Sequence, residues 1–202
     1  MTFNYWNDYY ENNGVPHDPS RFARFCLKEY IKKGQLLVDL GCGNGRDSFY
    51  FVKHKVNVLG IDYSTIIDKM LSFPMPLFIR MNLEKINKWV FNADVIYARF
   101  LLHSISEQCQ DKIICWAFDD LKEGGLLCLE FRSVKDDLYG KGEKRGRDTF
   151  FFNRHARRFI RKEEIEEEIR KAGFRIIYSL EDKGLSPFGR ENPMLIRIVA
   201  KK

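Results

Sequence analysis

The sequence predicts a single α/β domain, built on a doubly wound and mainly parallel sheet with helices on both faces. Two observations carry this prediction. Short β-rich runs alternate with helix-like segments along most of the chain, and several of these runs are apolar almost throughout, as strands covered on both faces should be. A length of 202 residues is enough to bury one sizeable core and too short for two average domains.

Seven runs are predicted to be strands because they are rich in β-branched and other apolar residues. In chain order they are Leu36–Leu40, Val56–Asp62, Pro76–Asn82, Ala93–Arg99, Gly125–Arg132, Phe174–Leu180 and Met194–Ala200. Strands that alternate with helices are typical of a parallel sheet.

Four segments between these runs are predicted to be helices, namely Arg46–Lys53, Thr65–Ser72, Glu107–Leu121 and Arg161–Ala172. The last of them is the best marked. Its Ile165 and Ile169 fall on one face at helical spacing, and Gly173 stands where a C-cap glycine is expected.

The alternation breaks once, after the fifth strand. Residues 133–159 are polar, strongly charged and dotted with glycines. Loops of this length are uncommon inside a compact domain and are often functional when they occur. We therefore expect an irregular loop that contributes to substrate binding.

Composition narrows the class of protein. The 34 basic and 28 acidic residues give a formal charge of +6 on a well-mixed background, so an anionic partner is allowed but not required. The five cysteines form no CxxC pair and mostly stand among apolar neighbours, which is typical of a reducing cytoplasm. No signal peptide and no run of about 18 apolar residues is found, so neither secretion nor membrane insertion is expected. No metal is expected either, because no H-x-x-x-H pattern or carboxylate cluster occurs at ligand spacing.

Three glycines, Gly41, Gly43 and Gly45, separate the first strand from the first predicted helix. In an open α/β sheet this turn lies where ligands bind. Glycine permits positive φ there and lets a ligand lie against the backbone, while the helix N-terminus offers free N–H groups. A dinucleotide fingerprint G-x-G-x-x-G would require glycine at position 46, where the chain has Arg46. The pattern is instead D-x-G-x-G-x-G, beginning at Asp39.

This pattern resembles the class I, Rossmann-like methyltransferases that use S-adenosylmethionine, and the resemblance runs from about Leu36 to the C-terminus. It implies S-adenosylmethionine as the cofactor and a sheet whose last strand is antiparallel. In that family the loop wraps the methionine end of the cofactor, and an acidic residue at the end of the second strand takes the ribose hydroxyls. Asp62 suits this role, because a carboxylate can accept two hydrogen bonds from a vicinal diol. Asn82 and Leu83 stand where the family faces the adenine. The cofactor-binding residues implied are Asp39, Gly41, Gly43, Gly45, Asp62, Tyr63, Asn82, Leu83 and Arg99.

Residues 1–34 precede the sheet and are rich in aromatic side chains. Enzymes of this kind often place such a segment as a lid over the cofactor. A helix packed on the sheet edge through Phe22 and Phe25 explains the same residues equally well, so both interpretations stay open.

Arginine and histidine recur at the ends of the fourth and fifth strands and in the charged loop. Arg99 and Arg132 end adjacent central strands and should border the ligand crevice, where a planar guanidinium suits a carboxylate or phosphate. We expect both to hold an anionic group of the methyl acceptor and His103 to act as the base. These three are the candidate catalytic residues, and the candidate substrate-binding residues are Arg99, Arg132, His155, Arg157 and Arg158. Taken singly, a surface salt bridge explains Arg157 or Arg158 as well, and local packing explains His103.

Further motifs resemble two branches of the family. The pair Gly45-Arg46 resembles the tellurite-resistance-like branch, in which a similar arginine abuts the cofactor, although a solvated helix start explains Arg46 as well. The motif order after the fourth strand resembles small methyltransferases of bacterial capsule clusters. This implies methyl transfer to an oxygen or nitrogen of a small anionic metabolite, or of a sugar or phosphoramidate derivative.

Nucleic acid is disfavoured as the substrate. The fourth strand is followed by neither the [D/N/S]-P-P-[Y/F] motif nor the Pro-Cys nucleophile of enzymes that methylate bases. Two alternatives stay open. One is an RNA methyltransferase that uses the basic stretch Lys141–Arg147, and the other is a non-catalytic protein that only binds the cofactor.

Overall fold

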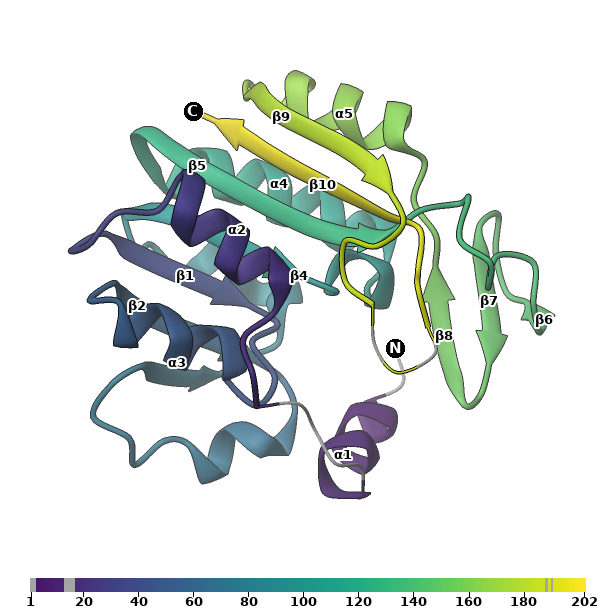
Figure 1. Cartoon of the computed structure of the whole chain (residues 1–202), viewed down its shortest axis with the longest axis horizontal. Coiled ribbons are helices and arrows are strands. Elements are labelled where there is room, and N and C mark those ends of the chain that lie inside the picture. The colour runs from purple at the N-terminus through teal and green to yellow at the C-terminus, as the bar shows by residue number, and fades with distance from the viewer. Residues whose placement is uncertain (1–2, 13–16, 188, 190) are drawn as a thin grey trace.

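The computed structural model describes residues 3–12, 17–187, 189 and 191–202, and its centre is a seven-stranded sheet. In sheet order the strands are β3 (Leu77–Arg80), β2 (Asn57–Asp62), β1 (Leu36–Leu40), β4 (Ala93–Arg99), β5 (Leu121–Arg132), β10 (Leu195–Lys201) and β9 (Arg175–Asp182). Neighbours from β3 to β5 are parallel, and β10 is antiparallel to both β5 and β9. The Rossmann-like sheet predicted from the sequence is confirmed, including its antiparallel last strand (Figure 1).

All seven predicted strands are present, and the bounds of β1 and β4 agree with the prediction at both ends. β5 begins four residues earlier than predicted. Its register against β4 shifts, because Ala93 faces Leu121 whereas Val95 faces Leu126. The extra residues include Gly124, whose positive φ of 76° lets the chain bulge without leaving the sheet.

Helices cover both faces of the sheet: α2 (Arg21–Glu29) and α3 (Arg46–Lys53) on one face, α4 (Glu107–Asp120) and α5 (Lys162–Lys171) on the other (Figure 1). Side chains of β4 alternate between the two cores, as the period of a strand requires. Val95 and Tyr97 pack on the side of α2 and α3, while Ile96 and Ala98 pack on the side of α4 and α5.

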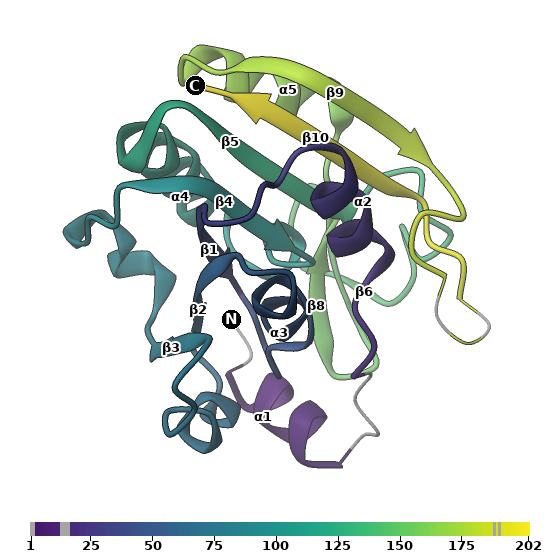
Figure 2. The ribbon, with the colours of Figure 1, turned by 60° about the vertical axis from the view of Figure 1, so that its left-hand side comes forward.

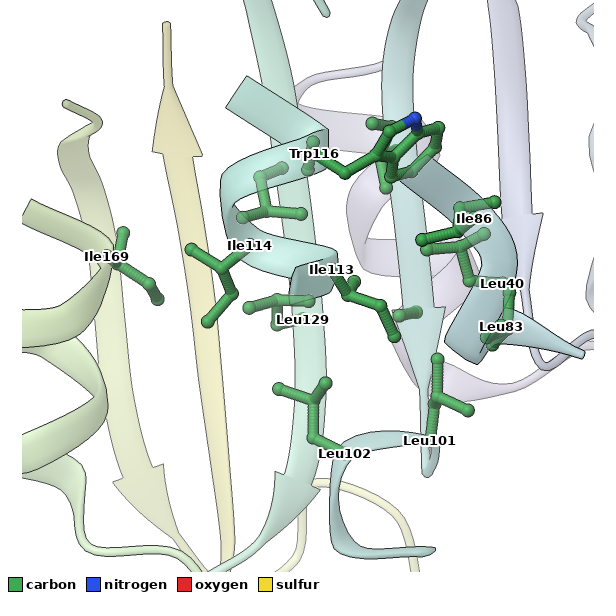
Figure 3. Packing of buried hydrophobic residues seen from close by; sticks show 14 of the residues in the cluster. Leu40, Leu83, Ile86, Leu101, Leu102, Ile113, Ile114, Trp116, Leu129 and Ile169 are labelled. Atoms are coloured by element: carbon green, nitrogen blue, oxygen red, sulfur yellow. The ribbon is translucent and has the colours of Figure 1, made fainter. Parts of the chain in front are cut away.

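The core on the side of α4 joins the helices to the central strands. Ile113 and Ile114 of α4, Ile169 of α5 and Leu129 of β5 belong to one cluster, and each is at most 1% exposed (Figure 3). Full burial of one such side chain contributes about 1.5–3 kcal/mol. This core therefore holds β4 and β5, whose carboxyl ends carry the candidate catalytic residues.

The helix expected at Thr65–Ser72 is a shorter 3₁₀ helix, η1 (Thr65–Lys69). The side chain of its N-cap residue, Ser64, makes no capping bond, and its hydroxyl donates to Asp62. Two further 3₁₀ helices, η2 (Leu83–Lys88) and η3 (Leu102–Ser104), follow β3 and β4.

Residues 133–159 are not an irregular loop, so that part of the prediction is wrong. They contain a small antiparallel sheet of β6 (Glu143–Lys144), β7 (Thr149–Phe152) and β8 (His155–Arg158). A tight turn with positive φ at Asn153 and Arg154 joins β7 to β8. Phe150, which is buried against Tyr139 and Phe159, gives this sheet an apolar anchor. The many charged residues around Phe150 interrupt the apolar pattern, so the sequence does not indicate a strand there.

The N-terminal segment supplies two helices in different places. α1 (Phe3–Asn12) lies beyond the carboxyl ends of the parallel strands (Figures 1 and 2). In α2, Phe22 is fully buried and its ring stacks on Tyr97 at 5.1 Å. Phe25 is partly buried beside Tyr178 of β9. α2 therefore packs on the face of the sheet rather than at its edge.

Candidate cofactor and acceptor site

A cavity of about 660 Å³ lies at the carboxyl ends of β1, β2, β4 and β5, where an open α/β sheet binds its ligand. Residues of α1 and β8 complete its wall. Among the residues singled out by sequence, those on the cavity wall are Asp39, Gly41, Asp62, Tyr63, Asn82, Leu83, Arg99, His103, Arg132, His155 and Arg157. Gly43, Gly45 and Arg158 do not line it.

The glycine turn has positive φ at Gly41, Gly43 and Gly45, between 55° and 73°, which glycine alone adopts without strain. A Cβ at Gly45 would lie 2.8 Å from the ring of Phe78, so this glycine allows the turn to pack against β3. A Cβ at Gly43 would collide with the hydroxyl of Tyr10 in α1. Gly41 of the turn thus lines the cavity, whereas Gly43 packs against Tyr10 of α1.

Asp62 ends β2 with its carboxylate held by the surrounding backbone. Oδ2 accepts a hydrogen bond from the Gly43 N–H (2.9 Å), and Oδ1 accepts from the N–H and the hydroxyl of Ser64 (both 2.8 Å). A carboxylate offers about four acceptor positions, so one position on Oδ2 stays open. To take both hydroxyls of a ribose, Asp62 needs the Ser64 hydroxyl to turn away.

Asp39 lies beneath the same turn and is buried. The Ser48 hydroxyl donates to its Oδ2 at 2.5 Å. Burial raises the pKa of Asp39 to about 8, although the hydrogen bond from Ser48 acts in the opposite direction. This carboxyl is therefore mostly protonated at neutral pH.

The two residues that begin α3 have different surroundings. The carboxylate of Asp47 accepts hydrogen bonds from the Ser20 N–H (2.7 Å), the Ser20 hydroxyl (2.7 Å) and the Tyr97 hydroxyl (2.8 Å), so it fixes the start of α2. Arg46 lines the cavity, and its Nε is buried with no hydrogen-bond partner in the described part of the chain. Arg46 thus lies on the cavity wall, where the resemblance of Gly45-Arg46 implies contact with the cofactor, and its position after the third glycine is the signal in the sequence.

Arg99 and Arg132 lie at the cavity, but carboxylates already balance their charges. Arg99 Nε donates to the fully buried Glu130 at 3.0 Å. Arg132 donates to both oxygens of Asp136 at 3.1 Å and to Glu191 at 2.9 Å. An incoming anion would compete with these partners, which weakens the simple clamp expected from the sequence.

A second group of polar side chains, here called the acceptor corner, consists of His103, His155 and Arg157. His103 Nδ1 and both ring nitrogens of His155 are buried without a hydrogen-bond partner among the described residues. Arg157 donates to the Phe152 carbonyl at 3.2 Å and pairs with no described carboxylate within 4.0 Å. Burial, reinforced by nearby arginines, lowers the pKa of His103 well below its ordinary value and that of His155 to about 3. Both imidazoles are therefore neutral near pH 7.

Arg158 was expected to bind substrate, but its guanidinium is used elsewhere. It donates to the carbonyls of Leu102 (2.9 Å) and Ile105 (3.3 Å) and to the Gln110 side chain (2.6 Å). These contacts hold η3, the short helix that carries His103. The structure therefore assigns Arg158 to support of the site and not to its wall.

Aromatic side chains of α1 form the side of the cavity opposite the strands. Tyr5, Trp6, Tyr9 and Tyr10 all line it, at spacings that share one side of a helix. The Tyr5 ring stacks on His155 with centroids 4.3 Å apart and planes 16° apart. α1 is thereby joined to both the glycine turn and the acceptor corner.

No three histidine, cysteine or carboxylate side chains of the described residues gather as metal ligands would. Within the same ranges, no helix combines the length and the apolar character needed to span a membrane. All five cysteines are free thiols.

Comparison with known proteins adds a family and a fold. A family model described as a methyltransferase domain matches residues 12–179. No curated protein sequence matches the chain.

Three solved structures illustrate the shared fold. A TehB-like S-adenosylmethionine-dependent methyltransferase from Corynebacterium glutamicum superposes with a TM-score of 0.67 at 19% identity, covering 98% of this chain and 95% of its own. The 1,6-didemethyltoxoflavin-N1-methyltransferase of Burkholderia thailandensis, with bound 1,6-didemethyltoxoflavin and S-adenosylhomocysteine, gives 0.73 at 15% identity, covering 98% and 85%. The [4+2]-cyclase SpnF gives 0.67 at 16% identity, covering 90% and 80%.

Proposed function

This chain belongs to the methyltransferase-domain family and uses S-adenosylmethionine as its cofactor, and on that premise we propose that it methylates an oxygen or nitrogen of a small anionic metabolite. One observation carries the proposal. A single cavity joins the residues expected to hold the cofactor at the ends of β1 and β2 to the acceptor corner.

The residues at the strand ends fit this cofactor. Asp62 would bind the ribose hydroxyls, beginning with its open Oδ2 position, while Asn82 and Leu83 would face the adenine. The buried Arg46 Nε makes no hydrogen bond within the described residues and lies 3.6 Å from the Asp47 carboxylate, and the carboxylate at the methionine end of the cofactor would accept its hydrogen bond. Asp39 and the glycine turn would complete the cradle.

When bound, S-adenosylmethionine supplies a methyl group attached to a positively charged sulfur. An acceptor atom can attack the methyl carbon in line with its bond to that sulfur. The protein then has to align the acceptor, exclude water and take up a proton. Alignment can supply roughly 7–11 kcal/mol. The aromatic side chains of α1 cover the cavity as a lid and keep water out. His103 is neutral near pH 7, so it can accept the proton that the acceptor loses.

The proposal that the acceptor is anionic is based on the residues of the acceptor corner. His155 is buried with neither ring nitrogen bonded to a described residue, and leaving such a group unpaired is costly. Arg157 is half-buried beside it, donates to the Phe152 carbonyl, and pairs with no described carboxylate. A carboxylate or phosphate would satisfy them. We assign the direct contacts with the anionic group of the acceptor to Arg157 and His155. Arg99 and Arg132 are already paired with carboxylates, so they contribute only to the positive electrostatic potential of the cavity. A sugar or phosphoramidate acceptor of cytoplasmic capsule biosynthesis fits this corner and has its further support in the motif order of the sequence.

The RNA alternative loses part of its basis. In the stretch Lys141–Arg147, Arg145 is paired with Glu143 at 2.7 Å and Arg147 with Glu164 at 2.6 Å. These partners reduce the positive field that a phosphate backbone would meet.

Methyl transfer should be tested with S-adenosylmethionine labelled in the methyl group and a panel of small carboxylates and phosphorylated sugars. We expect label transfer to an anionic acceptor, and a loss of about 10²- to 10⁴-fold in kcat for His103→Gln. His54→Gln, which changes an exposed histidine, is the matched control and should leave turnover unchanged.

Three results would contradict the proposal. Tight binding of S-adenosylhomocysteine without turnover on any acceptor would favour a non-catalytic binder. Transfer only to RNA, with affinity that falls steeply with salt, would favour the RNA alternative. Transfer only to neutral or cationic acceptors would remove the anionic class.

A further inference from the structure

His155 touches the lid and the acceptor site at the same time. Its ring is 2% exposed, stacks on Tyr5 at 4.3 Å, and meets the edge of Trp6 at 5.2 Å with planes 74° apart. Neither ring nitrogen has a partner in the described part of the chain. β8 places this ring on the cavity wall. A change in the charge of the imidazole would therefore affect both a ligand in the cavity and the aromatic rings of α1.

Burial and the charged groups around His155 explain why it is neutral near pH 7. Arg157 on β8 and Arg132 on β5 oppose a positive charge on the imidazole, and burial does so more strongly. His103 of η3 lies in the same corner, and Glu191 and Asp136 are engaged by Arg132. From α1, the aromatic rings of Tyr5 and Trp6 face the imidazole. Nearby, an exposed pair joins Arg154 to Asp8 at 3.2 Å.

We infer that His155 couples acceptor binding to closure of the lid: an anionic group bound beside Arg157 draws a proton onto His155, and the imidazolium then binds Tyr5 and Trp6 more tightly. This inference rests on the proposed function in so far as the cavity takes an anionic acceptor. The proton comes from the buffer and adds to a ring nitrogen, so no other bond forms or breaks.

Two physical effects support the coupling. A negative charge about 4 Å away favours the protonated ring strongly when both are shielded from water. A cation stacked on an aromatic face gains an attraction that a neutral ring lacks, and Tyr and Trp are among the rings that provide it. With a neutral His155 the lid would be held by stacking alone, and in the acceptor complex it would be held by cation–π contacts.

The proton should be measured with sulfate as the probe, because sulfate does not ionise near neutral pH. The full chain saturated with S-adenosylhomocysteine is titrated calorimetrically at pH 6, 7 and 8, in buffers of different ionisation enthalpy. We expect proton uptake on binding that is largest at pH 6, and a sulfate Kd that falls with decreasing pH by less than the roughly tenfold per unit that full uptake of one proton would give. His155→Gln should abolish the uptake, and the exposed control His54→Gln should keep it.

The lid should be measured by the dissociation rate of S-adenosylhomocysteine. At pH 6, sulfate should slow release by about 2- to 30-fold, the equivalent of 0.5–2 kcal/mol of cation–π attraction. Tyr5→Leu removes the stacked ring and should make the release rate insensitive to sulfate.

The inference is overturned if sulfate does not bind, if it binds without proton uptake, or if His155→Gln takes up the proton as the parent does. It is equally overturned if Tyr5→Leu still responds to sulfate as the parent does. Each of these results can occur while methyl transfer to an anionic acceptor persists, so they are distinct from failure of the proposed function.

Discussion

Replacing Asp39 by asparagine should stabilise the cofactor-free protein, and the gain should grow as pH rises. The carboxyl of Asp39 is buried, and burial raises its pKa to about 8. The unfolded chain releases this proton near pH 4, so between these two values the folded state binds more protons than the unfolded state. Stability contributed by the protonated carboxyl is therefore lost as pH rises through this window.

The magnitude follows from one proton. The free energy of unfolding of the parent should fall, relative to Asp39→Asn, by about 1.4 kcal/mol for each pH unit in the window. Between pH 5.5 and 7.5 the difference should change by about 2.8 kcal/mol in favour of the variant. The amide oxygen of asparagine can still accept the Ser48 hydroxyl, so the local hydrogen bond is kept.

Urea denaturation at several pH values, without cofactor, measures this difference. Asp137→Asn is the control, because Asp137 is exposed and its bond to Lys183 lowers its pKa. It should therefore show no such change between pH 5.5 and 7.5. Parallel curves for the parent and Asp39→Asn over this range would refute the reasoning, since Asp39 would then be ionised in the folded protein.

Three further substitutions test the cofactor cradle and its support. Asp62→Ala should weaken S-adenosylmethionine binding by about 1.5–3 kcal/mol in a calorimetric titration, the range for hydrogen bonds to a charged group; unchanged affinity in a folded variant would remove Asp62 from the site. Gly43→Val should lose measurable cofactor binding, because the turn needs positive φ and a side chain there collides with Tyr10; affinity equal to that of the parent would contradict this. Arg158→Gln should lower the free energy of unfolding by at least about 1.5 kcal/mol, because charged donors to η3 are lost; urea curves that coincide with those of the parent would show that the contacts carry no stability.

The parts of the site that follow from sequence are those in which local pattern and topology suffice. Apolar runs without alternation identify β1 and β4 to the residue, and the carboxyl end of a parallel strand must lie at the ligand crevice. Asp62 and Arg99 were therefore placed at the cavity wall from their positions in the chain. The glycine turn was equally readable, since few other reasons exist for three alternate glycines between a strand and a helix.

Which charged side chains pair with one another could be determined only from the tertiary structure. Glu130 stands in an apolar strand sequence with no sign of its role, yet it is fully buried between Arg99 and Arg197. Arg157 and Arg158 are adjacent on β8 and chemically identical, but successive side chains of a strand point to opposite faces. One therefore reaches the cavity, and the other reaches the carbonyls of η3.

The sequence by itself determined the seven strands of the large sheet in their order along the chain, the glycine turn and the crevice, because periodicity and connectivity are local properties that burial enforces along each element. Only the tertiary structure decided which guanidinium groups are already paired, that α1 lines the cavity through Tyr5 and Tyr10, and that residues 133–159 contain a small sheet. These outcomes depend on contacts between side chains far apart in the chain. The free energy of such a contact depends on shared desolvation and on exact distance, and neither is encoded in the spacing of residues.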